Sequence, residues 1–361
     1  MKKIVFGITN LNMGGAEKIL VDLVNKLCKD YDITIFTIYG NGDLENELDK
    51  SIKLISYKET KYEELSFFEK RKMSLMFKNK FFLKSIYKQF IDNKFDRGIA
   101  FLEGPMTSLM AQSSSFDKIA WVHTNLSLHL SKVSQKKNIE ETYKKYKKII
   151  FVSQDALKGF NSIFKIKNKK LVINNYINAK RVINVSKEKV DFKVDTKIPS
   201  FISVCRLVKA KGVDRLLLAS KKLINDGYNH KIYIIGDGPL KPQLVKLIDT
   251  LEMSDNFILL GQKSNPYSYV KKVKNFVLVS LYEGYPTVIV EAMILDRMII
   301  STNTGAREIL NNYDNKLIVD NDFMGIYNGL KKVITNKYKI KTTKQKKYNS
   351  DKIIEEIKTI L

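Results

Sequence analysis

The sequence has few of the residues that mark disulfide-bonded, metal-binding or membrane-spanning proteins. Among its 361 residues there are two cysteines, Cys28 and Cys205, far apart within apolar runs, so we interpret both as small buried side chains. The three histidines form no evident ligand cluster, which predicts no bound metal and no cofactor. No apolar run approaches the roughly 18 residues of a membrane span, and Asn10 and Asn12 interrupt the first run before signal-peptide length. We therefore expect a protein of the reducing cytoplasm.

Acidic residues are scarce relative to basic ones. The chain has 63 Lys and Arg against 38 Asp and Glu, a net charge of +25, so an anionic partner is expected. Nucleic acid, anionic lipid and a phosphorylated substrate are all compatible with this charge. Hydrophobic residues make up 44% of the chain, which is enough to build cores and excludes a largely disordered protein.

Apolar runs of strand length alternate with helical segments along the chain. Because strand, helix and strand recur in this order, we predict parallel sheets flanked by helices. The polar stretch 178–200 marks a domain boundary. We expect a Rossmann-like domain at 1–180, a second at 181–345, and a terminal helix at 346–361 that packs back on the first. The predicted strands cover residues 3–9, 32–39, 97–102, 118–123, 148–153, 171–175, 201–205, 231–236, 256–261, 275–280, 298–302 and 316–320.

Two Rossmann-like domains in one chain imply a ligand crevice. Ligands of open parallel sheets bind beyond the carboxyl ends of the strands. We therefore expect the two domains to face each other across a cleft, with the ligand residues on loops that follow strands.

The strongest local motif is SLYEGYPTVIVEAM at 280–293. Its two carboxylates, Glu283 and Glu291, are eight positions apart, with Gly284 and Pro286 between them. We expect Glu283 on a loop and Glu291 on the following helix. A carboxylate accepts hydrogen bonds from paired hydroxyls, so Glu291 suits a ribose diol and Glu283 the hydroxyls of a sugar.

A phosphate site is expected at the start of that helix. If the helix begins near Pro286 or Thr287, the amides of Thr287 and Val288 point out of its N-terminus, where an anion is favoured. Two carboxylates next to such a helix end suit a sugar nucleotide.

A pair of cations follows another predicted strand. Arg206 comes just after the strand, and Lys211 with Gly212 comes just before the next helix. Together they would neutralise a diphosphate leaving group. Taken alone, each cation is better explained as a solvated surface residue, and only the two together with the glutamate pair favour a ligand site.

Three further features carry weaker signals. The turn Gly236-Asp237-Gly238 lets the backbone approach a base or ribose. Gly14-Gly15 opens a helix and suits phosphate or acceptor, without the spacing of a dinucleotide fingerprint or P-loop. His123 follows a strand and suits a contact with a sugar hydroxyl, although a structural role explains it equally well.

The sequence Asp320-Asn321-Asp322 has the spacing by which some sugar transferases hold a divalent ion. It follows the last predicted strand, far from the other motifs in the sequence. We interpret it as a loop or helix cap and not as a metal site.

Taken together, these motifs resemble the family 4 retaining glycosyltransferases of GT-B fold, over nearly the whole chain. The resemblance implies that Arg206 and Lys211 bind the donor diphosphate, Glu291 the ribose, and Glu283 the sugar. It implies a metal-independent reaction that retains the anomeric configuration, in which the departing diphosphate takes the acceptor proton. The implied catalytic residues are His123, Arg206, Lys211 and Glu283, and the implied donor-binding residues are Gly14, Gly15, Arg206, Lys211, Gly236, Asp237, Gly238, Glu283, Gly284, Tyr285, Pro286, Thr287, Val288 and Glu291.

Two residues depart from the family pattern, Tyr285 and Cys205. Neither removes a charged ligand, so the implied donor binding is unaffected. We expect a hexosyltransferase or N-acetylhexosaminyltransferase that uses a UDP-sugar and acts on a glycan or lipid-linked acceptor in bacterial surface polysaccharide or glycoconjugate synthesis. The alternatives are a sugar-nucleotide epimerase of the same fold and a basic nucleic-acid-binding protein. The latter is disfavoured because no nucleic-acid-binding motif is present, so we expect no nucleic-acid partner.

The segment 66–88 is strongly basic and rich in aromatic residues. It carries seven Lys and Arg residues against one acid, Glu69. As a helix or helix pair it would lie on an anionic membrane with its phenylalanines in the interface, which predicts a peripheral protein at the inner face of the plasma membrane. The alternative is an ordinary helix whose aromatics pack on the first sheet. The residues concerned are Phe67, Phe68, Phe77, Phe81, Phe82, Lys70, Arg71, Lys72, Lys78, Lys80, Lys84 and Lys88.

Overall fold

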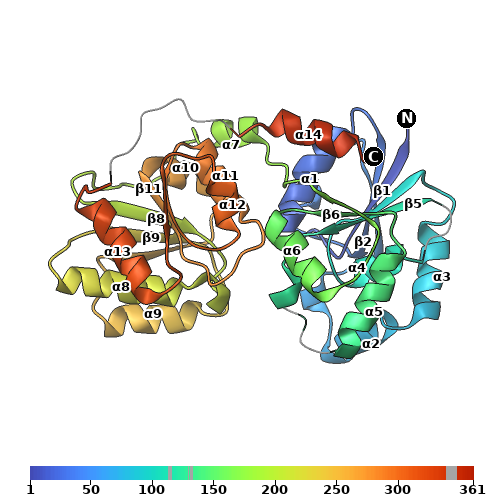
Figure 1. Ribbon diagram of the computed structural model, residues 1–361, viewed down its shortest axis with the longest axis horizontal. Helices are drawn as coiled ribbons and strands as arrows, with labels where there is room; N and C mark the ends of the chain where they lie inside the picture. The colour runs from blue at the N-terminus through green and yellow to red at the C-terminus, as the bar shows by residue number, and fades with distance from the viewer. Residues whose placement is uncertain (113–115, 129, 131–132, 339–347) are drawn as a thin grey trace. The chain divides into compact units, whose positions relative to one another are not determined.

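The computed structural model describes residues 1–112, 116–128, 130, 133–338 and 348–361 (Figure 1). The chain forms two compact units, one of Met1–Ile177 with Asp351–Leu361 and one of Asn178–Ser350. Each unit is built on one parallel sheet with helices around it, so the predicted α/β class and the two Rossmann-like domains are confirmed. The expected junction at residues 345 and 346 lies outside the described residues.

The first unit contains a seven-stranded sheet in the order β3-β2-β1-β4-β5-β6-β7, with every pair parallel. Its strands are β1 (Lys3–Ile8), β2 (Asp32–Tyr39), β3 (Lys53–Lys58), β4 (Arg97–Ala100), β5 (Asp117–Val122), β6 (Lys148–Phe151) and β7 (Lys169–Val172). Its helices are α1 (Gly15–Leu27), α2 (Phe67–Met76), α3 (Lys80–Phe90), α4 (Pro105–Met110), α5 (Val133–Lys144), α6 (Gln154–Ile163) and α14 (Ser350–Lys358).

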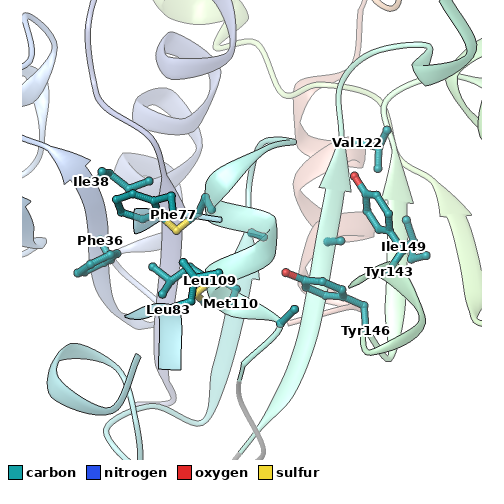
Figure 2. Close-up of a cluster of buried hydrophobic side chains, with 14 of the residues drawn as sticks. Phe36, Ile38, Phe77, Leu83, Leu109, Met110, Val122, Tyr143, Tyr146 and Ile149 are labelled. Atoms are coloured by element: carbon teal, nitrogen blue, oxygen red, sulfur yellow. The ribbon is translucent and has the colours of Figure 1, made fainter. Parts of the chain in front are cut away.

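The core of the first unit lies on the central strands. Five of the six residues of β1 are buried, because a parallel strand covered on both faces needs apolar side chains throughout. Figure 2 shows part of this core, where Phe77 and Leu83 from the α2–α3 region lie near Leu109 and Met110 of α4.

The terminal helix α14 packs on the first unit, beside α1 (Figure 1). Lys358 pairs with Asp30 at 2.9 Å. Lys2 Nζ donates a hydrogen bond to the carbonyl of Leu361 at 2.7 Å, and Arg97 donates one to the carbonyl of Ile360. These contacts join the two ends of the chain.

The second unit contains a six-stranded parallel sheet in the order β10-β9-β8-β11-β12-β13. Its strands are β8 (Ser200–Val204), β9 (Lys231–Ile235), β10 (Phe257–Gly261), β11 (Asn275–Leu278), β12 (Met298–Thr302) and β13 (Lys316–Val319). Its helices are α7 (Ala179–Val185), α8 (Val213–Asn225), α9 (Lys241–Thr250), α10 (Pro266–Lys272), α11 (Thr287–Ile294), α12 (Ala306–Leu310) and α13 (Phe323–Ile334).

Each sheet has one point where the strand order reverses. In the first sheet it lies between β1 and β4, and in the second between β8 and β11. Loops that leave the carboxyl ends of such neighbouring strands diverge to opposite sides of the sheet, which opens a crevice between them. The topology therefore marks one candidate site on each unit.

Candidate functional site

The second unit brings two predicted motifs together at its switch point. Lys211 ends the short 3-10 turn Lys209–Lys211 after β8, and Glu283 lies on the loop after β11. The two loops are joined directly, because the amide of Leu281 donates to the carbonyl of Ala210 at 2.8 Å. Gly212 reverses the chain after Lys211 with φ 63°, a conformation that favours glycine.

Lys211 and Glu283 form the centre of this site. Lys211 Nζ donates to Glu283 Oε1 at 2.6 Å, and Ser280 Oγ donates to the same oxygen at 2.6 Å. The carboxylate side chain is 10% exposed and the lysine 26%. A charge pair that is partly shielded in this way holds its geometry better than an exposed pair. Ser280 carried no signal of its own in the sequence.

Arg206 lies after β8 with an exposed side chain. Its guanidinium forms no hydrogen bond or ion pair with any residue of the described part of the chain. A guanidinium offers five donors in a fixed fork, which matches phosphate oxygens. Arg206 therefore has its donors available at the strand end that also leads to Lys211.

The helix α11 begins at Thr287, after Pro286 at its N-cap. The amides of Thr287 and Val288 are in its first turn and have no acceptor within the helix. Glu291 lies one turn further along, and its Oε1 accepts a hydrogen bond from the Tyr267 hydroxyl at 3.2 Å. Along the chain, the loop after β11 and the helix α11 thus present the Glu283 carboxylate, then the amides of the first helical turn, and then the Glu291 carboxylate.

The loop from Glu283 to Pro286 is held against α12. The amide of Gly305 donates to the carbonyl of Glu283 at 3.2 Å. A Cβ at Gly305 would lie 2.4 Å from the carbonyl oxygens of both Glu283 and Gly284, so only glycine permits this approach. Tyr285 turns into the unit, where burial first and Glu308 second raise the pKa of its hydroxyl.

The turn at residues 236–238 packs against the strand end that carries Arg206. Gly236 has φ 143°, and a Cβ there would lie 1.9 Å from the carbonyl oxygen of Cys205. The Asp237 carboxylate is engaged locally, with the amide of Gly238 at 2.7 Å and Lys241 at 2.6 Å. The Asp237 side chain thus stabilises the turn, whose backbone lies beside the strand end that carries Arg206.

The remaining predicted residues lie in the first unit. Gly14 is the N-cap of α1, and Gly15 is its first residue, with open space where a Cβ would be. A Cβ at Gly14 would meet the Glu17 carboxylate at 2.1 Å, and burial raises the pKa of that carboxyl. The glycines thus lie at the end of β1, on one side of the first switch point.

His123 follows β5 and its ring stacks near Phe101, with centroids 4.7 Å apart. Its Nε2 is inaccessible to solvent and has no hydrogen-bond partner among the residues that the structure describes. Burial lowers its pKa to about 3, so the imidazole is neutral at physiological pH. The ring is held by aromatic packing, with one polar atom unsatisfied.

The Asp320-Asn321-Asp322 segment has structural roles, as predicted. Asp322 caps α13 by accepting from the amide of Gly325 at 2.7 Å. Asn321 accepts a hydrogen bond from Arg215 at 2.9 Å. Among the described residues, no group of three or more His, Cys, Asp or Glu side chains is arranged to hold a metal ion.

Glu103 was not among the residues predicted from the sequence. It lies on the loop after β4, and Gly14 lies on the loop after the neighbouring strand β1, so both loops leave the sheet at the first switch point. Its Oε1 accepts from the amides of His123 and Thr124, both at 2.7 Å, and from the Thr124 hydroxyl at 3.0 Å. Burial raises the pKa of this carboxyl. The only signal in the sequence was its place directly after a strand.

Comparison with known proteins gives consistent matches. Residues 184–352 match the family model of the glycosyl transferases group 1. A Campylobacter jejuni protein named N-acetylgalactosamine-N,N'-diacetylbacillosaminyl-diphospho-undecaprenol 4-alpha-N-acetylgalactosaminyltransferase is 26% identical, over 99% of this chain and 97% of its own. A Methanocaldococcus jannaschii glycosyltransferase is 35% identical over 202 residues, which are 53% of this chain and half of that protein's length.

The fold matches solved structures along the whole chain. The Anabaena protein HepE, determined in complex with UDP and glucose, superposes with a TM-score of 0.76 at 16% identity and covers 100% of this chain and 99% of its own. At this identity the match establishes the fold, which is GT-B. No helix in the described part of the chain is long and apolar enough to cross a membrane.

Proposed function

Because this chain is a group 1 glycosyltransferase with a GT-B fold, we propose that it is a retaining, metal-independent enzyme that uses a UDP-sugar. The second unit binds the donor and the first binds the acceptor. The transferred sugar is a hexose or an N-acetylhexosamine, and the acceptor is a glycan or lipid-linked saccharide of bacterial surface polysaccharide or glycoconjugate synthesis. Relatives named for transfer to diphospho-undecaprenol saccharides and for capsular polysaccharide synthesis support this acceptor class.

The observation that carries the proposal is the contact between Lys211 and Glu283. It holds an ammonium and a carboxylate at the switch point, within reach of one ligand. Arg206 adds a second cation from the same strand end, and the first turn of α11 adds free amides. Cations and amides bind a diphosphate, whereas the carboxylate accepts hydrogen bonds from sugar hydroxyls. A nucleotide sugar carries both groups.

Each residue then has a definite task. Arg206, Lys211 and the amides of Thr287 and Val288 stabilise the negative charge that grows on the diphosphate as the bond to the sugar breaks. Glu291 binds the ribose and Glu283 the transferred sugar. Gly14, Gly15 and the 236–238 turn offer backbone contacts, and Gly284, Tyr285 and Pro286 shape the loop between the carboxylates. His123 contacts the sugar as a neutral imidazole.

A two-stage experiment tests the proposal. Thermal shift with UDP-, GDP- and ADP-sugars identifies the donor, because a ligand that binds the folded state raises the melting temperature. Incubation with that donor and lipid-linked acceptors, followed by NMR of the product, reports the anomeric configuration. Retention is expected. Inversion would refute the retaining mechanism, and isomerisation of the donor alone would favour an epimerase.

We also propose that the first unit contacts an anionic membrane at the inner face of the plasma membrane. The predicted helix pair is α2 with α3, and its aromatics divide: Phe77 is buried in the core, whereas Phe67, Phe68 and Phe81 are 72%, 81% and 86% exposed. Leu75 is exposed on α2 as well, at helical spacing from Phe68 and Arg71. Exposed aromatics among lysines suit a negatively charged lipid interface.

Vesicle sedimentation tests this contact. Binding to anionic vesicles should exceed binding to neutral ones and should fall when Phe67 and Phe68 are both changed to Ser. Phe323→Ser, at an exposed position in the second unit, is the matched control and should bind like the wild type. Equal partitioning into both vesicle types would refute the membrane contact.

A further inference from the structure

The first unit contains a cavity of about 310 Å³ beside its switch point. Residues of α2, the β4–α4 turn and α5 form its walls. The surface they expose to the cavity is mainly apolar, with one carboxylate at one side and one ammonium at another. The residues that define its character are Phe77, Lys78, Glu103, Leu126, Ile139 and Tyr143.

Glu103 supplies a carboxylate, and therefore a hydrogen-bond acceptor, to the wall of this cavity. All the hydrogen bonds that Glu103 receives from other described residues fall on one oxygen, Oε1, through the amides of His123 and Thr124 and the Thr124 hydroxyl. Oε2 receives none from them, while the side chain lines the cavity. A carboxylate oxygen that accepts no hydrogen bond from another described residue can accept one from a ligand that brings a hydroxyl or amide hydrogen.

The size of the cavity limits what it holds. Small-molecule sites span about 300 to 1,000 Å³, so 310 Å³ accommodates one ring and not an oligosaccharide or a long prenyl chain. Sugars offer hydroxyl donors on their edges and C–H groups on their faces. A carboxylate beside Phe77 and Tyr143 matches both surfaces.

The position of the cavity suits the acceptor saccharide of the transfer reaction. Glu103 holds the backbone of His123, the residue assigned to the transferred sugar, so its own ligand would lie close to the point of transfer. Ser74 and Lys78 approach the cavity from the α2 side, the helix whose other residues form the proposed membrane surface. A saccharide carried on a membrane lipid would reach the cavity from that side.

We propose that this cavity is the subsite for the acceptor's terminal sugar, and that Glu103 accepts hydrogen bonds from its hydroxyl or acetamido groups through Oε2. This inference rests on the proposed function and assigns the residue that selects its acceptor. Glu103 binds the acceptor and also positions the His123 loop.

Methyl NMR of the full chain tests the subsite. The probes are the methyl glycosides of glucose, galactose, N-acetylglucosamine and N-acetylgalactosamine, added to millimolar concentrations. At least one should shift the methyl signals of Leu126 and Ile139 in a saturable way. Glu103→Gln should weaken that binding about tenfold, the equivalent of one charge-assisted hydrogen bond. Glu141→Gln, an exposed carboxylate on the same helix as Ile139, should leave it unchanged.

A second variant keeps the test valid if Glu103→Gln disturbs the fold. Ser74→Trp, at an exposed position on the cavity's edge, should block the sugar-induced shifts. If no glycoside shifts these methyls, or if the shifts are equal in wild type, Glu103→Gln and Ser74→Trp, the subsite is wrong. UDP-sugar titrations of the same samples separate the two proposals: donor binding without glycoside binding overturns the subsite alone, whereas the absence of donor binding overturns the proposed function.

Discussion

Replacement of Lys211 by alanine should remove most of the catalytic power of the donor site. The ammonium lies 2.6 Å from Glu283 and is the better shielded of the two cations assigned to the diphosphate. Loss of one preorganised donor to a developing oxyanion lowers kcat by about 10² to 10³, or about 2.7 to 4 kcal/mol. We expect a loss of this size in kcat/KM for Lys211→Ala.

The same change should cost little stability. Breaking a fully buried pair costs about 3 to 5 kcal/mol, and an exposed pair about 0 to 1 kcal/mol. With side-chain exposures of 26% and 10% for Lys211 and Glu283, and with Ser280 still bound to the carboxylate, about 1 to 2 kcal/mol is expected. Most of the kinetic loss therefore cannot come from unfolding.

Three comparisons make the Lys211 assay decisive. Steady-state kinetics with the donor from the thermal-shift screen would be run on Lys211→Ala, Lys211→Arg and Lys209→Ala. Lys209 is exposed in the same short turn, so its variant should match the wild type. Lys211→Arg keeps the charge and should recover part of the rate. If Lys211→Ala keeps kcat/KM within about twofold of wild type, the diphosphate assignment is refuted.

Three further predictions concern other parts of the site. The ring of His123, whose pKa burial lowers to about 3, should show no NMR titration between about pH 5 and 8; a midpoint in that window would contradict the packing described. Gly305→Ala should weaken donor binding about tenfold by calorimetry, because its Cβ displaces the Glu283–Gly284 loop, and unchanged affinity would mean that the loop is not a donor contact. Burial raises the pKa of Glu103 above 4.5, so ionisation destabilises the folded wild type as pH rises through and above that value. As pH rises above the ordinary glutamate pKa of about 4.3, the melting temperature of Glu103→Gln should therefore rise relative to wild type, and a constant difference would refute this cause.

Most of the fold could be predicted from the sequence. The central strands are buried on both faces, so they read as continuous apolar runs, such as KIVFGI in β1 and MIIST in β12. The edge strand β3 was not predicted, because none of its residues is fully buried and its sequence KLISYK contains only a short apolar run. An edge strand has a neighbouring strand on one side only and is less covered by helices, so fewer of its side chains need to be apolar.

The candidate sites of the two units differed in how far they could be predicted from the sequence. Glu283 and Lys211 were proposed from the sequence because charged residues flank glycine and proline at strand ends, although their 2.6 Å contact depends on β8 lying beside β11. Glu103 was missed because a single glutamate in a turn has no diagnostic spacing. Its position at the first switch point depends on β4 lying beside β1, and the strand order across a crossover cannot be predicted from local sequence.

The sequence also did not predict which aromatic side chains of the α2–α3 region are buried and which are exposed. Phe77 and Phe81 have similar surroundings in the sequence, yet one is buried and the other is 86% exposed. The division follows from which face of each helix meets the first sheet. Periodicity alone left both arrangements open, since aromatic residues occur on several faces of the segment.

The proposed donor site in the second unit binds a nucleotide diphosphate through Arg206, Lys211 and α11, with Glu291 on the ribose. Isothermal titration calorimetry of UDP with the wild type, Glu291→Ala and Lys209→Ala tests it most directly. UDP should bind the wild type and Lys209→Ala equally, and Glu291→Ala about tenfold or more weakly, because the ribose loses a charged hydrogen-bond acceptor. Absence of UDP binding to the wild type, or equal affinity in Glu291→Ala, would contradict the account.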